Sequence, residues 1–79
     1  MTYYVYILKS DQGEHRYVGQ TSEIKARLKD HNAGRCPHTA KFRPWQVETA
    51  VAFQSEEKAH AFERYLKSGS GREFARLHF

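Results

Sequence analysis

The sequence contains only one cysteine, two prolines and no long hydrophobic run, and each shortage excludes a class of protein. A single thiol, Cys36, cannot form an internal disulfide, which fits a reducing compartment, so we expect a cytoplasmic protein. No apolar stretch reaches the length of a transmembrane helix, so we expect no association with a membrane. Residues 1–4 lack the basic and apolar regions of a secretory signal peptide.

Basic side chains outnumber acidic ones by 13 to 9, which gives a net charge of +4. The 39% hydrophobic and 28% charged residues are typical of a folded globular chain rather than a disordered one. With 79 residues, we expect a single domain over 1–79 with a thin core. The positive charge favours an anionic partner, most commonly nucleic acid, although many small basic proteins bind nothing acidic.

Three segments are predicted to be strands. Residues 3–8 are aromatic and β-branched with apolar side chains on both faces, as in a central strand. Residues 11–14 form a turn, and residues 16–19 form a second strand antiparallel to the first. Residues 45–53 alternate apolar with polar or small side chains and predict a third strand.

A first helix is predicted between the second and third strands. Thr21 or Ser22 is a suitable N-cap, and the helix runs to about Asn32, where Gly34 helps to end it. Residues 35–44 form a basic loop with two prolines and no clear periodicity.

A second helix is predicted to start after the N-cap Ser55 and to run to Lys67, where residues 68–71 stop it. The last residues, 72–79, form a short helical tail docked through two apolar side chains, Phe74 and Leu77. The order β-β-α-β-α with this tail predicts an α+β fold, in which helices flank a small three-stranded antiparallel or mixed sheet.

A carboxylate interrupts the apolar face of the second helix. Ala59, Phe62 and Leu66 have helical spacing, and Glu63 falls in the same stripe. Buried carboxylates are rare unless they are paired or bind a metal. Two structural explanations stay open beside a functional one: an internal salt bridge to Arg27, or an edge position that reaches solvent.

Further polar groups gather in the first half of the chain. Arg27 and His31 lie four residues apart on the inward side of the first helix. Tyr6 and Tyr17 lie on the paired strands, where they are close across the hairpin. Each has an ordinary explanation: a snorkelling arginine, a histidine favoured by the helix dipole, and tyrosines that pack in the core. Together they suggest a polar cluster.

This constellation resembles the GIY-YIG nuclease superfamily, most closely its small stand-alone bacterial members. Tyr4-Val5-Tyr6 matches the first signature and Tyr17-Val18-Gly19 the second. The family's helix arginine, the histidine one turn later and the metal-binding glutamate match Arg27, His31 and Glu63. The resemblance covers nearly the whole chain.

The sequence departs from the family pattern at several positions. Tyr4 stands for the leading glycine, and Val5 and Val18 stand for isoleucines, while both signature tyrosines are kept. The asparagine that follows the glutamate in many larger members is absent, and Lys67 and the basic tail occupy that region. This last departure bears on how the phosphate is held.

The resemblance implies hydrolysis of DNA phosphodiester bonds with one Mg²⁺ or Mn²⁺ ion. Glu63 would hold the ion, and Arg27 would bind the phosphate and stabilise charge in the transition state. Tyr17 is the first choice for the general base, His31 assists directly or through a tyrosine, and Tyr6 positions water or phosphate. The choice of base among these three stays open. We expect all five side chains to converge on one concave patch.

Basic side chains outside this set are predicted to follow the DNA backbone: Lys41, Arg43, Lys67 and Arg72. Phe42 and Trp45 are expected to pack in the core rather than to stack on a base, and Cys36-Pro37-His38 lacks the spacing of a zinc site. So small a chain would depend on a second copy or a partner protein for further DNA contacts. The alternatives are a nucleic-acid-binding module with weak or lost catalysis, and a protein-interaction domain.

Overall fold

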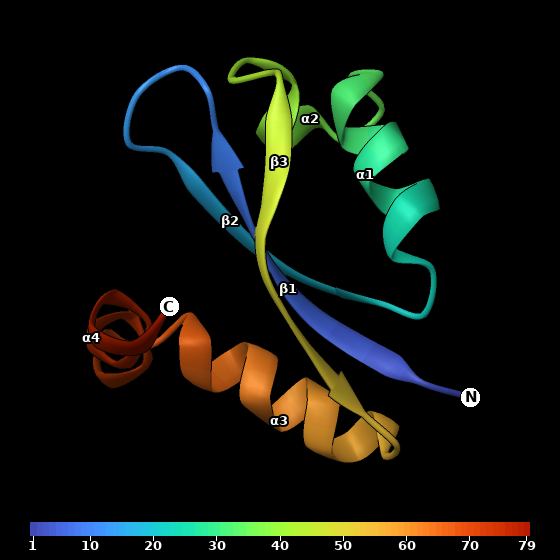
Figure 1. The fold of residues 1–79 in the computed structure, drawn as a ribbon, viewed down its shortest axis with the longest axis vertical. Coiled ribbons are helices and arrows are strands. Elements are labelled where there is room, and N and C mark those ends of the chain that lie inside the picture. The colour runs from blue at the N-terminus through green and yellow to red at the C-terminus, as the bar shows by residue number, and fades with distance from the viewer.

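The computed structural model describes all residues from 1 to 79 and contains one three-stranded antiparallel sheet (Figure 1). Its strands are β1 (Tyr3–Ser10), β2 (Arg16–Thr21) and β3 (Trp45–Phe53), arranged in the order β2-β1-β3. The apolar first strand is therefore central, as its sequence predicts, and β2 and β3 are the two edges. The α+β fold class is confirmed, and the sheet is antiparallel rather than mixed.

The strand register determines which side chains share a face. In the β1–β2 hairpin Tyr6 lies opposite Gly19, and Leu8 lies opposite Tyr17. Because side chains alternate along a strand, Tyr6, Leu8 and Tyr17 project on one face, and Val5 and Ile7 project on the other. The β1–β3 register shifts between Ile7 and Leu8.

Helices α1 (Ile24–Asn32) and α2 (Pro37–Ala40) cover the Tyr6 face (upper half of Figure 1). Tyr6, Leu8 and Trp45 form the buried centre of this layer, and the partly buried Ile24 and Leu28 of α1 pack against them. The indole Nε1 of Trp45 donates to the Thr39 carbonyl at 2.8 Å, so the tryptophan is a core residue, as expected. Phe42 packs on the same cluster and stacks on His15.

Helices α3 (Glu56–Leu66) and α4 (Gly69–His78) cover the opposite face (lower half of Figure 1). Val5 and Ile7 of β1 meet Ala59 and Leu66 of α3 in a second buried cluster. Four aromatic side chains extend it outward and contact one another across the two helices: Phe53, Phe62, Tyr65 and Phe74.

The helix starts agree only in part with the sequence. Ser55 caps α3 as predicted, since its hydroxyl accepts from the Lys58 backbone N–H at 3.2 Å. Neither Thr21 nor Ser22 is the N-cap of α1. That position falls to Glu23, which makes no side-chain capping bond, while the Thr21 hydroxyl accepts from the Glu23 N–H at 3.0 Å. The threonine thus orders the turn before the helix rather than its first turn.

Two helical segments differ from the prediction. The basic loop contains the short helix α2, and α4 begins at Gly69, because Ser68 caps it through a hydrogen bond from the Gly71 N–H. A Cβ added at Gly71 would lie 1.7 Å from the Tyr65 carbonyl oxygen, so this glycine allows α4 to start directly against the end of α3. Phe74 docks the tail as expected, but Leu77 is 62% exposed. None of the helices has the length and apolarity needed to cross a membrane.

Candidate active site

The two signature tyrosines meet over a glycine on the edge strand. A Cβ added at Gly19 would lie 2.5 Å from the Tyr6 hydroxyl and 3.0 Å from the Tyr17 ring. Any side chain there would have to displace both rings, so the glycine is needed for the two phenols to approach each other. Their ring centroids are 6.3 Å apart.

A buried hydrogen-bonded chain runs inward from Tyr6. Its hydroxyl lies 3.1 Å from Nε2 of His31, whose Nδ1 lies 2.8 Å from the Thr39 hydroxyl. The Thr39 hydroxyl donates to the Cys36 carbonyl at 3.3 Å. With that proton committed, Nδ1 carries the ring hydrogen and donates to Thr39, and Nε2 accepts from Tyr6. The chain therefore fixes both the tautomer of His31 and the direction of the Tyr6 hydroxyl.

Burial governs the protonation of this chain. His31 is completely buried and Tyr6 is 2% exposed. Burial raises the pKa of Tyr6 to about 12, aided by the neighbouring Tyr17, although the charge of Arg27 opposes the shift. Burial and the charge of Arg27 lower the pKa of His31. Both groups are therefore neutral at physiological pH.

Tyr17 differs from Tyr6 in being only half-buried. Its ring lies 4.8 Å from that of His31, centroid to centroid, so it belongs to the same aromatic cluster. It also lines a cavity on the α4 side of the sheet, together with Lys67 and Arg72. Because β2 is an edge strand, Tyr17 is reached from both faces.

Arg27 stands at the rim of the tyrosine cluster. Its side chain is 38% exposed, and Nη1 lies 3.8 Å from a carboxylate oxygen of Asp30, a loose contact between partly exposed groups. The guanidinium is close enough to influence both Tyr6 and His31 electrostatically. Arg27 thus offers its donors to solvent from beside the tyrosines, and the predicted cluster of Tyr6, Tyr17, Arg27 and His31 is present.

Glu63 does not join that face. It belongs to α3, which covers the other side of the sheet, and its side chain is 17% exposed. Its carboxylate accepts from Lys67 at 3.0 Å and lies 3.6 Å from the His60 imidazole. The alternative of an internal pair with Arg27 is therefore wrong. The expected single face is also not observed for Glu63, whose ion-pair partner Lys67 lines the same cavity as Tyr17.

Glu63 provides a carboxylate suited to a hard divalent cation. No cluster of three or more His, Cys, Asp or Glu side chains forms a closed metal site. Magnesium does not require one, since it commonly binds through one or two carboxylates and completes its octahedron with waters and substrate phosphate. Glu63 offers one carboxylate, and its side chain is 17% exposed. It therefore fits a site in which the protein supplies one ligand and water or substrate phosphate supplies the others.

The predicted DNA-binding cations divide between two regions. Lys41 and Arg43 lie just after α2, where the Arg43 Nε donates to the Ala40 carbonyl at 2.9 Å. Lys67 and Arg72 lie at the junction of α3 and α4 and line the cavity that Tyr17 also borders. Thr39 is a member of the buried chain that sequence reasoning missed, because nothing in an aperiodic loop marks one threonine as buried.

The fold and the arrangement of these residues agree with a known family. Residues 2–75 match the model of the GIY-YIG catalytic domain, and the chain belongs to this family. It is 33% identical over 78 residues to the UPF0213 protein BH0048 of Halalkalibacterium halodurans, covering 98% of this chain and 82% of that one. A UPF0213 protein of Streptococcus pneumoniae is 34% identical over 65 residues, which cover 81% of this chain and 65% of the relative. The solution NMR structure of BH0048 superposes with a TM-score of 0.59.

Proposed function

We propose that this protein is a divalent-metal-dependent endonuclease that hydrolyses phosphodiester bonds in DNA, acting through one nuclease domain over residues 1–79. The observation that carries the proposal is the meeting of Tyr6 and Tyr17 over Gly19, with the His31 ring against both and the partly exposed Arg27 beside them. A purely structural cluster would not need, at its open side, a cation whose ion pair is a loose 3.8 Å contact to Asp30. Membership of the GIY-YIG catalytic family supports the same activity.

The two tyrosines would have different tasks. Tyr6 is buried and its pKa is raised to about 12, so it is a poor proton acceptor at neutral pH. Tyr17 reaches the surface and is the group that takes a proton from the attacking water. His31 has no exposed surface, so it acts through Tyr6 as a positioning residue. Tyr6 then fixes the ring of Tyr17 and orients water or phosphate near it.

Arg27 would bind the scissile phosphate. Its planar guanidinium can donate two parallel hydrogen bonds to phosphate oxygens, and charge developing on those oxygens strengthens the contact in the transition state. One side chain thus binds the substrate and stabilises the transition state.

Glu63 would hold the Mg²⁺ or Mn²⁺ ion. When bound, the ion would offset negative charge on the phosphate and the leaving oxygen. Glu63 is on the α3 side of the sheet and the tyrosine cluster is on the α1 side, while Lys67 and Tyr17 line one cavity, so we place the scissile phosphate at the β2 edge between them. The ion would replace Lys67 as the partner of the Glu63 carboxylate, and Lys67 would then be free to bind a neighbouring phosphate.

Cleavage of supercoiled plasmid DNA in Mg²⁺ tests the proposal, with EDTA as the metal-free control. We expect Glu63→Ala and Tyr17→Phe to abolish nicking. Matched variants that keep it are Glu57→Ala, an exposed carboxylate on the same helix, and Tyr65→Phe, an exposed phenol. A wild-type protein that binds DNA but never cuts it in Mg²⁺ or Mn²⁺ would instead support the alternative of a binding module with lost catalysis.

A further inference from the structure

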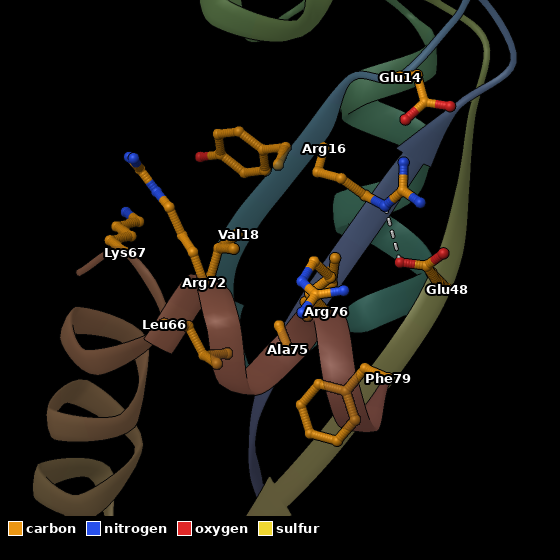
Figure 2. A pocket seen from close by; sticks show the side chains of 12 residues that line it. Glu14, Arg16, Val18, Glu48, Leu66, Lys67, Arg72, Ala75, Arg76 and Phe79 are labelled. Atoms are coloured by element: carbon orange, nitrogen blue, oxygen red, sulfur yellow. Dashed lines mark hydrogen bonds and ion pairs between the residues drawn. The ribbon is translucent and has the colours of Figure 1, made fainter. Parts of the chain in front are cut away.

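A cavity of about 550 Å³ lies between α4 and the β1–β2 hairpin (Figure 2). This volume is within the range of sites that hold small organic ligands. The cavity is on the sheet face opposite to the buried Tyr6–His31 chain, but Tyr17 forms part of its wall. A group bound here would therefore be next to the proposed general base.

The lining combines an apolar interior with a charged rim. Six hydrophobic residues contribute to the wall: Ile7, Tyr17, Val18, Leu66, Ala75 and Phe79. Figure 2 shows Lys67 and Arg72 together at one side, whereas Glu14 and Glu48 lie toward the opposite side. The cavity thus has Lys67 and Arg72 at one end, an apolar wall, and Glu14 with the Arg16–Glu48 ion pair toward the other end.

Ion pairing distinguishes the cations of the rim. Arg16 pairs with Glu48 at 2.9 Å, and Arg76 pairs with Glu73 at 2.5 Å. Lys67 pairs with Glu63, the proposed metal ligand. Arg72 has no salt bridge and no side-chain hydrogen bond anywhere in the chain. Its guanidinium is therefore free for an anion from outside.

We propose that this cavity holds one unpaired nucleotide of the DNA substrate, adjacent to the bond that is cut. Arg72 binds the phosphate of that nucleotide, and its base lies on the apolar wall that includes Phe79. Aromatic and apolar side chains bind unstacked bases with little dependence on sequence. The free carboxylate of Glu14 is at the end where a base presents its amino groups. This inference rests on the proposed nuclease function and gives it a substrate class.

A fully paired base cannot enter such a cavity without leaving its helix, which costs unstacking and unpairing energy. The substrate class is therefore DNA with an unpaired nucleotide beside the cut, as in a bulge, a flap or a single strand. Duplex DNA without such a defect would be bound through its backbone only, and more weakly.

Fluorescence anisotropy in EDTA tests this without any cleavage. The probes are a fully paired duplex and the same duplex with one bulged nucleotide, each end-labelled. We expect the protein to bind the bulged duplex about tenfold more tightly, because the unpaired base can stack on the apolar wall of the cavity. Substituting 2-aminopurine for the bulged base should give a fluorescence change on binding that the paired duplex lacks.

Two variants address the cavity from different sides. Arg72→Ala removes the free cation, and Ala75→Leu fills the interior. Both should reduce the preference for the bulge to near unity while binding of the paired duplex changes less. Arg64→Ala is the matched control, because it removes an exposed arginine of α3 that does not line the cavity.

Equal affinity for the two duplexes, or an undiminished preference in Arg72→Ala, would overturn the inference. Thermal melting shows whether the Ala75→Leu protein is folded. If it is unfolded, the result for Arg72→Ala tests the inference, because the Arg72 side chain is exposed and its removal should not affect folding. Absence of cleavage in Mg²⁺ would refute the nuclease proposal alone, since the bulge preference is measured without metal.

Discussion

The Tyr6 hydroxyl lies 3.1 Å from Nε2 of His31, and this buried contact connects the tyrosine cluster to the interior of the protein. His31 cannot touch substrate because it has no exposed surface. His31 can act only by orienting the Tyr6 hydroxyl and by accepting its hydrogen bond. The arrangement of Tyr6 and Tyr17 thus depends on a residue that has no exposed surface.

Thr39 should matter for stability through the same chain. Thr39→Val keeps the shape but leaves Nδ1 of His31 buried without a partner, which costs about 1–3 kcal/mol. Thr39→Ser keeps the hydroxyl and should lose less. Urea unfolding of both variants measures the difference. Equal destabilisation would mean that the methyl group, rather than the hydrogen bond to His31, matters at this position.

The lowered pKa of His31 predicts an acid-sensitive fold. The unfolded chain takes up a proton near pH 6.5, but the folded chain resists it to lower pH. The stabilising contribution is therefore complete above pH 6.5 and is lost as pH falls toward the folded value. Denaturant unfolding between pH 7.5 and 5.5 should show this decline, and His31→Gln should flatten it. An NMR titration of the His31 ring at or above pH 6.5 would contradict the prediction.

Glu63→Gln should separate the fold from the chemistry. The partners of Glu63 are half-exposed or more, and pairs of this kind are worth about 0–1 kcal/mol, so the melting temperature should change little. Cleavage in Mg²⁺ should fall by orders of magnitude, because the amide cannot replace the charge that the ion requires. A large fall in the melting temperature of Glu63→Gln, together with a wild-type protein that does not cut DNA, would indicate that Glu63 has a structural role instead.

DNA affinity should fall steeply with salt, since phosphate contacts release counterions. Lys41→Ala should reduce the slope of log K against log salt by about 1 if this lysine contacts a phosphate. Arg43→Ala should also disorder the segment after α2, because the Arg43 side chain donates a hydrogen bond to the Ala40 carbonyl. Lys58→Ala, on α3, serves as the control. A slope unchanged by Lys41→Ala would remove the residues after α2 from the DNA interface.

Gly19→Ala should damage the site more than the sheet. The added methyl group must displace the Tyr6 hydroxyl and the Tyr17 ring, which are the ends of side chains rather than backbone. Overpacking of this kind costs about 1–3 kcal/mol, and we expect a folded protein that has lost cleavage. Circular dichroism and plasmid nicking measure the two effects. Full activity in this variant would show that the spacing of the tyrosines is not critical.

The sheet could be read from the sequence because its signals are local. The third strand was predicted with its observed bounds, and the alternation along the first two strands placed Tyr6 and Tyr17 together correctly. The tail was underestimated for a tertiary reason. The glycines before residue 72 indicate a break, yet Gly71 is inside α4, since only glycine fits against the Tyr65 carbonyl.

The polar cluster was predictable to the extent that helical spacing determines it. Arg27 and His31 share one side of α1, as their four-residue separation indicates, with His31 buried and Arg27 at the rim. Spacing on one helix, however, cannot say which face of the sheet another helix covers. Glu63 therefore lies across the sheet from Tyr6, contrary to expectation. The cavity and the role of Thr39 depend on how α4 and α2 dock, which no local pattern encodes.

The position of β2 at the edge of the sheet limits how copies of this fold can assemble. An outer strand has a row of free backbone N–H and C=O groups, so it invites a strand from another chain to extend the sheet. A strand added to β2 would lie beside Gly19 and close the approach to Tyr17 along this edge. Self-association through continuous pairing that keeps Tyr17 accessible would therefore use the β3 edge, at the opposite side of the sheet. A dimer built that way would have a six-stranded sheet with the β2 strands of the two copies at its outer edges.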